Sequence, residues 1–144
     1  MEDPSRRLTP SGGDLRSVDA FYVLPGNESD AAVAGFWPQE PGSYYERTIV
    51  RPAAFALREQ AGIVLVADLH RINWKYGTFA LKLALLDSGC VAAHCIAAAG
   101  RYGLQVELKE GIVADPDLRN VLDLTSEYEA VTSILWFEKR AQES

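Results

Sequence analysis

The longest apolar stretch of the chain, Phe79 to Ala99, restricts the possible folds more than any other feature. It belongs to a helical pattern from about Trp74 to Tyr102 that is apolar nearly all round, and a helix of that kind must be buried. Lys82, Asp87 and His94 interrupt the stretch. Because each of them is costly at bilayer depth, we expect a buried core helix and no membrane span.

Short β-prone segments lie on both sides of this helix. One of them, Ile63–Ala67, is apolar without alternation, which predicts a central strand covered on both faces. The other expected strands are Val18–Leu24, a hairpin of Val33–Trp37 and Tyr44–Val50, then Leu104–Leu108 and Val131–Phe137. Helix-favouring residues predict two short helices, Pro52–Gln60 and Asp115–Leu122. The order predicts an α+β fold, with a mostly antiparallel sheet packed on a long buried central helix.

The length of the chain limits the number of domains, and its net charge limits the kinds of partner that it can bind. A chain of 144 residues is the size of one domain, which we place at residues 15–138, after a flexible segment 1–14 and before a polar tail 139–144. The net charge of −6 repels polyanions and argues against nucleic acid. The start carries no secretory signal, and Cys90 and Cys95 point apart on one helix, so we expect free thiols and a cytoplasmic protein.

Lys75 and Tyr76 stand out because they begin an otherwise apolar helix. A lysine in a first turn faces the positive end of the helix dipole, which disfavours it, so another interaction is expected there. A partly desolvated lysine at such a place has a pKa suited to acid-base work, and Tyr76 could exchange the proton. The alternative is structural: Trp74 and Tyr76 border the core and Lys75 reaches solvent.

Other candidates carry weaker signals. Cys90 and His94 share a helix face and could pair a thiol with a base or hold a metal, but only the distant His70 could join them, so we interpret both as packing residues. The segment from Pro10 to Gly13 could bind a phosphate, although such segments are more often linkers. The scattered Asp and Glu residues are interpreted as a solvated surface, with no metal site.

Several stretches of the chain together match a known family. In the central helix they are Trp74–Gly77, Ala80–Gly89 and Ala97–Leu104, and outside it Arg7–Leu15, Val18–Val23, Asp115–Leu122 and Glu127–Leu135. The stretches of the helix resemble the nitroreductase-like family, and specifically its SagB-type azoline dehydrogenase branch. The other stretches are similar to the loop, strand and closing helix of that branch, and the resemblance spans most of residues 7 to 137.

The resemblance implies an α+β homodimer that holds FMN between its subunits and oxidises thiazoline or oxazoline rings of modified peptides. By position it implies Lys75 and Tyr76 as the catalytic pair, with Ser11 and Gly12 as cofactor-binding residues. It also leads us to expect that the family's N-terminal flavin-phosphate segment, with its Arg-Ser-x-Arg motif, is lacking.

Two functions are therefore expected. The first is an FMN-dependent dehydrogenase that acts on azoline-type rings of a peptide or on a related substrate. The alternative is a degenerate, non-catalytic nitroreductase-like subunit that serves as a dimerisation or scaffold partner in a peptide-modifying assembly. In both cases we expect a homodimer or a heteromer with a related subunit.

Overall fold

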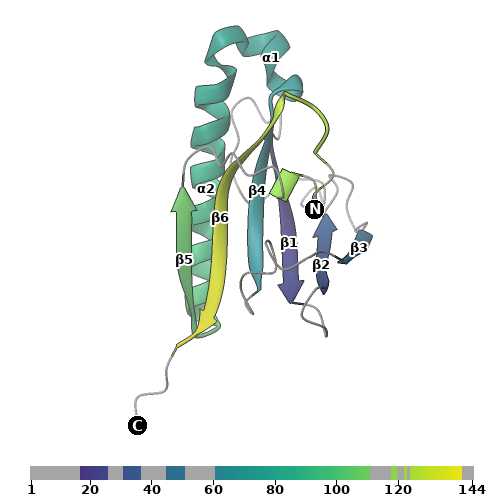
Figure 1. Cartoon of the computed structure of the whole chain (residues 1–144). Coiled ribbons are helices and arrows are strands. Elements are labelled where there is room, and N and C mark those ends of the chain that lie inside the picture. Colours follow the sequence, from purple (N-terminus) through teal and green to yellow (C-terminus); the bar gives the residue numbers. More distant parts are fainter. Residues whose placement is uncertain are drawn as a thin grey trace, which may run out of the picture.

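Six antiparallel strands form one sheet, and a long helix packs on one of its faces (Figure 1). The computed structural model describes residues 17–25, 31–36, 45–50, 61–110, 118–119, 122 and 124–140. For residues 24–25, 31–36 and 45–50 it describes the backbone only. The strand order is β3-β2-β1-β4-β6-β5. The strands are β1 Val18–Pro25, β2 Ala31–Phe36, β3 Tyr45–Val50, β4 Gly62–Asp68, β5 Leu104–Glu110 and β6 Glu129–Lys139.

The strands predicted from sequence are present, and the predicted hairpin pairs β2 with β3. β4 is central, between β1 and β6, as its unbroken apolar run indicated. Its alternate side chains enter two cores. Leu65 packs toward the helix with Ala92, whereas Val64 and Val66 pack on the opposite face with Leu118 and its neighbours.

A β-bulge interrupts the pairing of β4 with β6. Leu65 pairs with Ser133 while the next residue, Val66, pairs with Val131, so Thr132 is the extra residue. A bulge re-aims the side chain of its extra residue. Thr132 and Ser133 therefore both approach Ser88 on the covering helix, although neighbours on a regular strand would point to opposite faces.

The helical segment begins earlier than the sequence predicts and is bent. It consists of α1 (His70–Tyr76), the 3-10 turn η2 (Gly77–Phe79) and α2 (Ala80–Arg101). Gly77 has a positive φ of 51°, which ends α1 and lets α2 leave in a new direction across the sheet (Figure 1). α2 ends at Arg101, and Gly103, with φ 71°, closes it two residues later, as predicted.

The helix that the sequence predicts to be buried is covered on only one of its faces within this single chain. α2 buries one face, through Ala84, Ser88, Ala92 and others, but its outer face is exposed within this single chain. A helix that lies on one sheet has only one side covered by it. The large apolar side chains left exposed on the helical segment and just after it are Trp74, Phe79, Leu81, Leu85, Leu86, Ile96 and Tyr102.

By length and composition alone, the run His70–Arg101 could cross a membrane, a test that core helices of soluble proteins also pass. The predicted helix Pro52–Gln60 lies outside the described residues. Most of the predicted helix Asp115–Leu122 lies outside them too, and of its described residues Leu118 and Arg119 are helical. β6 runs through Lys139, one residue into the predicted tail, and the segment 1–14 is not described.

Candidate functional site

Lys75 and Tyr76 are the last two residues of α1, at the bend that leads into α2. The sequence interpretation placed Lys75 in a first turn, against the helix dipole. That placement is wrong, because α1 starts at His70 and Lys75 stands in its last turn. A cation is favoured there by the negative end of the dipole, so the position needs no further interaction to explain it.

The two side chains lie side by side in different environments. Lys75 is exposed, and its Nζ lies 5.5 Å from the centre of the Tyr76 ring, within range of a cation–π contact. Tyr76 is half-buried and packs against the core cluster that contains Ile72 and Ala80, so it borders the core as the structural alternative proposed. Trp74 does not border the core, because its side chain is 75% exposed. Its Nε1 donates a hydrogen bond to the carbonyl oxygen of Arg71.

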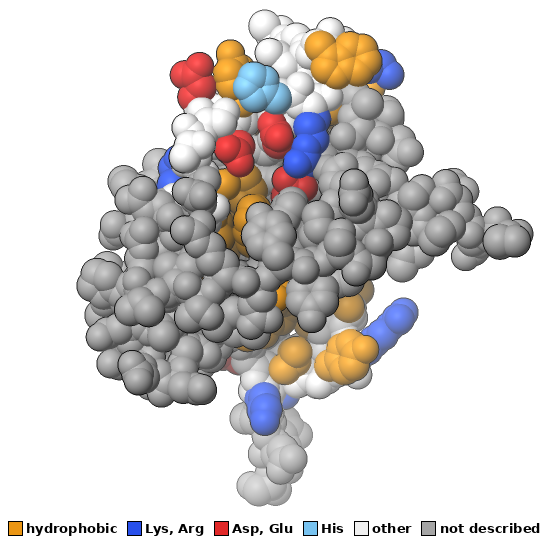
Figure 2. Space-filling view, turned by 90° about the vertical axis from the view of Figure 1, so that its right-hand side faces the viewer, with side chains coloured by type: hydrophobic (Ala, Val, Ile, Leu, Met, Phe, Trp, Pro, Cys, Tyr) orange, Lys and Arg blue, Asp and Glu red, His pale blue; other side chains and the backbone are white. Residues whose placement is uncertain are grey.

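A charged cluster joins α1 to the sheet. Arg71 donates two hydrogen bonds to the carboxylate of Asp19 on β1, at 2.8 and 2.7 Å, and its Nε lies 3.3 Å from Asp68 at the end of β4. Burial alone lowers the pKa of Arg71, but hydrogen bonding to Asp19 and the charges of Asp19, Asp68 and Glu129 outweigh it and raise that pKa. Figure 2 shows acidic, basic and histidine side chains gathered at this end of the molecule.

A second carboxylate is buried beneath α2. Asp87 is 6% exposed and accepts a hydrogen bond of 2.8 Å from the Ser17 hydroxyl, just before β1. Asp19 is also buried, at 7% exposed. The interpretation of all acidic residues as a solvated surface is therefore wrong for these two. Buried carboxylates must be hydrogen-bonded. The sequence did carry a signal for Asp87, because it is an isolated Asp within an apolar helix.

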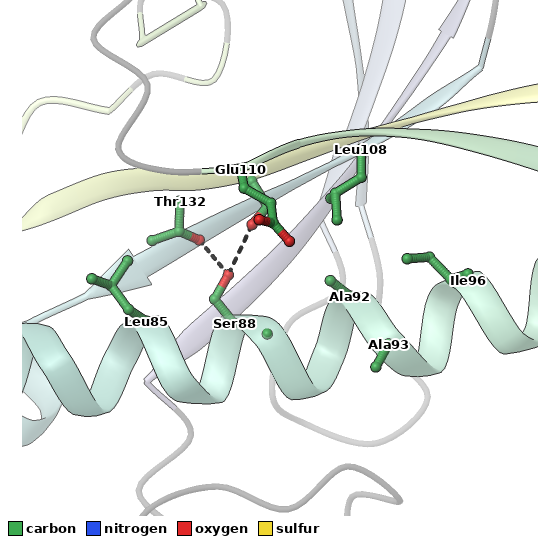
Figure 3. A pocket seen from close by; sticks show the side chains of 10 residues that line it. Leu85, Ser88, Ala92, Ala93, Ile96, Leu108, Glu110 and Thr132 are labelled. Atoms are coloured by element: carbon green, nitrogen blue, oxygen red, sulfur yellow. Dashed lines mark hydrogen bonds between the residues drawn. The ribbon is translucent and has the colours of Figure 1, made fainter.

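A cavity of about 370 Å³ opens between α2, β5 and β6. Leu85, Ile96 and Leu108 form its apolar walls, and Glu110 lies between Thr132 and Leu108, across from Ser88 (Figure 3). Ser88 points from α2 to the hydroxyls of Thr132 and Ser133, at 2.5 and 3.4 Å. Sequence reasoning missed this cavity, because the residues that line it come from three separate segments.

The thiols and His94 do not form a site. Cys90 and Cys95 are free, as predicted. Cys90 and His94 are exposed, so the interpretation of both as packing residues is wrong, and His94 Nδ1 lies 2.9 Å from the carbonyl oxygen of Cys90. Burial raises the pKa of the Cys95 thiol. In the described part of the chain, no three His, Cys, Asp or Glu side chains converge to hold a metal ion.

The expected FMN contacts at Ser11 and Gly12 lie outside the described residues. A dianionic phosphate needs several convergent charged donors. Arg71 is already held by two carboxylates, and the cavity beside α2 carries an acidic residue, Glu110. Taken alone, the described residues of one chain do not fit the phosphate of FMN.

The arrangement of sheet and helix matches solved structures. A chain of the E. coli microcin synthetase McbBCD complex with truncated pro-MccB17 bound aligns with 99% of this chain, with a TM-score of 0.72 and 17% identity. Putative nitroreductases from Ralstonia eutropha JMP134 and Anabaena variabilis ATCC 29413 align with TM-scores of 0.69 and 0.71, at 17% and 16% identity. The fold is nitroreductase-like.

These similarities confirm the α+β fold that the sequence resemblance implied. The two putative nitroreductases align over 95% and 92% of this chain, so the nitroreductase-like fold accounts for nearly all of it. The chain spans 59% of the microcin synthetase chain, 64% of the Ralstonia protein and 29% of the Anabaena protein. Sequence searches find neither a matching family model nor a matching curated protein.

Proposed function

We propose that this chain is a subunit of a flavin-dependent oxidoreductase with the nitroreductase-like fold, whose flavin site is completed by a second subunit. In this proposal Lys75 and Tyr76 are the catalytic pair, and the substrate is an azoline-type ring of a modified peptide. A microcin synthetase complex with a bound peptide is among the proteins of similar fold, which supports the choice of substrate class.

One observation carries the proposal. Lys75 and Tyr76 are adjacent at the bend between α1 and α2, and the outer face of α2 that starts there is apolar and exposed. An exposed apolar face of this kind marks an interaction site. A subunit packed on it would cover the bend, desolvate the Lys75 ammonium and bring the two groups into a closed site. Desolvation lowers the pKa of a lysine, which suits it to take up a proton with Tyr76 beside it.

A non-catalytic subunit is the second candidate. It is favoured by the exposure of Lys75 and by the position of Tyr76, whose ring is already accounted for by packing. In that case α2 serves only to assemble the complex, and the bend only directs the chain.

Substitutions at the bend separate the two functions. Lys75→Ala and Tyr76→Phe are compared with Thr78→Ala, an exposed position of the same bend, in the complete assembly acting on its peptide. A catalytic pair predicts that each of the first two lowers the rate by about 100-fold or more while the assembly stays intact on a sizing column. A non-catalytic subunit predicts rates that all match the unaltered assembly.

A further inference from the structure

The cavity between α2 and the edge of the sheet formed by β5 and β6 combines apolar walls with a few polar side chains (Figure 3). Its volume of about 370 Å³ is large enough for a small organic molecule. Leu85, Ile96 and Leu108 supply hydrocarbon, and the polar groups are Glu110 and three hydroxyls. This division of apolar walls and few polar groups is typical of small-molecule sites.

The Glu110 carboxylate stands in this cavity without a cation. Among the residues that the structure describes, none donates a hydrogen bond to it or forms an ion pair with it. No Lys, Arg or His is found among the described residues that line the cavity. Glu110 on β5 pairs in register with Ser133 on β6, and residues directly opposite in a sheet point to the same face. The carboxylate and the Ser133 hydroxyl therefore share the cavity.

The hydroxyls of the cavity are ordered in one direction. Thr132 donates its hydroxyl proton to the carbonyl oxygen of Leu65, at 3.2 Å, and a hydroxyl has only one proton to give. In the 2.5 Å contact between Thr132 and Ser88, Ser88 must therefore be the donor. Ser88 then has no proton left for its 3.4 Å contact with Ser133, so Ser133 donates there. The protons run toward the backbone, and lone pairs are left for the cavity.

We propose that this cavity binds a primary ammonium group carried on an unbranched alkyl chain. The ammonium would lie between Glu110, Ser88 and Ser133, and the alkyl chain would lie along the apolar walls. A primary ammonium has three N–H donors and no acceptor, which matches a carboxylate and two hydroxyl oxygens. A charge inside a cavity is tolerated when it is paired and hydrogen-bonded, as here. The proposal goes beyond the proposed function and does not depend on it.

Other heads fit the same lining less well. A carboxylate or a phosphate would be repelled by Glu110 and would meet lone pairs instead of protons. An alcohol has one donor and no charge, and a quaternary ammonium has the charge without any N–H. The net charge of −6 also favours the approach of cations over anions. Two sources offer the required head, a free alkylamine and the lysine side chain of a peptide.

The test is a titration of the purified, ¹⁵N-labelled full chain without FMN, followed by the amide NMR shifts of Gly89, Ala93 and Ser133. The ligands share one alkyl chain and differ in the head: n-hexylamine, 1-hexanol, hexanoate and trimethylhexylammonium. N-acetyl-lysine methylamide represents the peptide source. We expect n-hexylamine to bind at least about tenfold more tightly than each of its three analogues, because only it has both the charge and the N–H donors.

Two variants locate the binding. Glu110→Gln should weaken n-hexylamine about tenfold and leave 1-hexanol within about twofold, which also shows that the cavity is intact. The matched control is Glu107→Gln, which removes the same charge from β5 at a position that alternates to the opposite face, and it should change binding by less than about twofold. Ala93→Leu, at an exposed lining position of α2, should fill the cavity and weaken both ligands at least about tenfold. Circular dichroism verifies that each variant is folded.

Several outcomes would overturn the proposal. Equal binding of n-hexylamine and 1-hexanol would reduce the site to an apolar cavity without a choice of head. Unchanged binding in Glu110→Gln or in Ala93→Leu would place the amine elsewhere on the chain, and the absence of shifts with any ligand would leave no site at all. Binding of n-hexylamine or of the lysine derivative at the cavity supports the proposal, and the tighter of the two identifies the source.

Discussion

Arg71 on α1 holds Asp19 on β1 through two hydrogen bonds of 2.8 and 2.7 Å, one from each terminal nitrogen of the guanidinium to each carboxylate oxygen. The bidentate geometry makes this one of the stronger kinds of ion pair. It fixes α1 against the sheet one helical turn before Lys75, so the position of the bend depends on it.

We predict that Arg71→Ala lowers the free energy of unfolding by about 2 to 3 kcal/mol, because Asp19 would remain buried without its charged donor. Urea denaturation measures the change. The matched control is Arg101→Ala, which removes an exposed cation and should cost less than about 0.5 kcal/mol. Equal losses for the two variants would show that the Asp19 contact contributes nothing.

Gly62 at the start of β4 lies against the ring of Trp136. A Cβ at this position would stand 2.8 Å from Cε3 of Trp136 and 3.1 Å from the carbonyl oxygen of Leu135. Trp136 is 9% exposed and part of a core, so it cannot move freely. We predict that Gly62→Ala lowers the free energy of unfolding by about 1 to 3 kcal/mol through overpacking.

Gly89 supplies the comparison for that measurement. It is exposed on α2, and a Cβ there meets no atom within 4 Å. Alanine favours helix over glycine, so Gly89→Ala should raise the free energy of unfolding by up to about 1 kcal/mol. A Gly62→Ala variant as stable as the unaltered chain would show that Trp136 can move away.

The Ser88 hydroxyl links α2 to the bulge on β6 at Thr132. The Thr132 hydroxyl also donates to the carbonyl oxygen of Leu65, at 3.2 Å, so it keeps one partner when Ser88 is changed. We therefore predict a modest loss of about 1 kcal/mol for Ser88→Ala. A double-mutant cycle with Thr132→Val should give a coupling of about 0.5 kcal/mol or more, and purely additive losses would rule out the contact.

Cys95 provides a pH-dependent prediction. Burial raises the pKa of its thiol in the folded chain, because the thiolate is disfavoured away from water. A group whose folded pKa is raised contributes stability below its unfolded pKa and loses it as the pH rises through the folded value. The free energy of unfolding should thus fall as the pH rises past the ordinary thiol range.

The comparison variant for this effect is Cys95→Ala. Its alkaline decrease should be smaller than that of the unaltered chain. Denaturation of both proteins at a series of alkaline pH values measures the difference. Identical pH profiles for Cys95→Ala and the unaltered chain would assign the decrease to other groups.

The strands could be predicted because each carries its own signal. The unbroken apolar run of β4 indicated a strand covered on both faces, and Leu65 and Val66 do enter opposite cores. The turn formers between β2 and β3 indicated their hairpin. Gly103 marked the end of α2 because a positive φ favours glycine. Such features depend on neighbours in sequence.

The features missed depend on residues far apart in the chain. Asp19 and Arg71 are separated by 52 positions and Ser17 and Asp87 by 70, so no local pattern shows that these carboxylates are buried. The break at Gly77 was missed because Lys75 and Tyr76 were read as the start of one continuous helix. The exposure of α2 was missed because an apolar helix is buried only where something covers it, and a single sheet covers one side.

The central claim is that the chain contributes to a flavin site completed by a second subunit. The most direct measurement is the flavin absorbance of the purified chain and of its complex with the polypeptide that binds α2, each after addition of FMN and gel filtration. The account predicts that the complex retains FMN, while the chain alone retains little, since its described residues do not fit the phosphate. A complex that emerges colourless would contradict it.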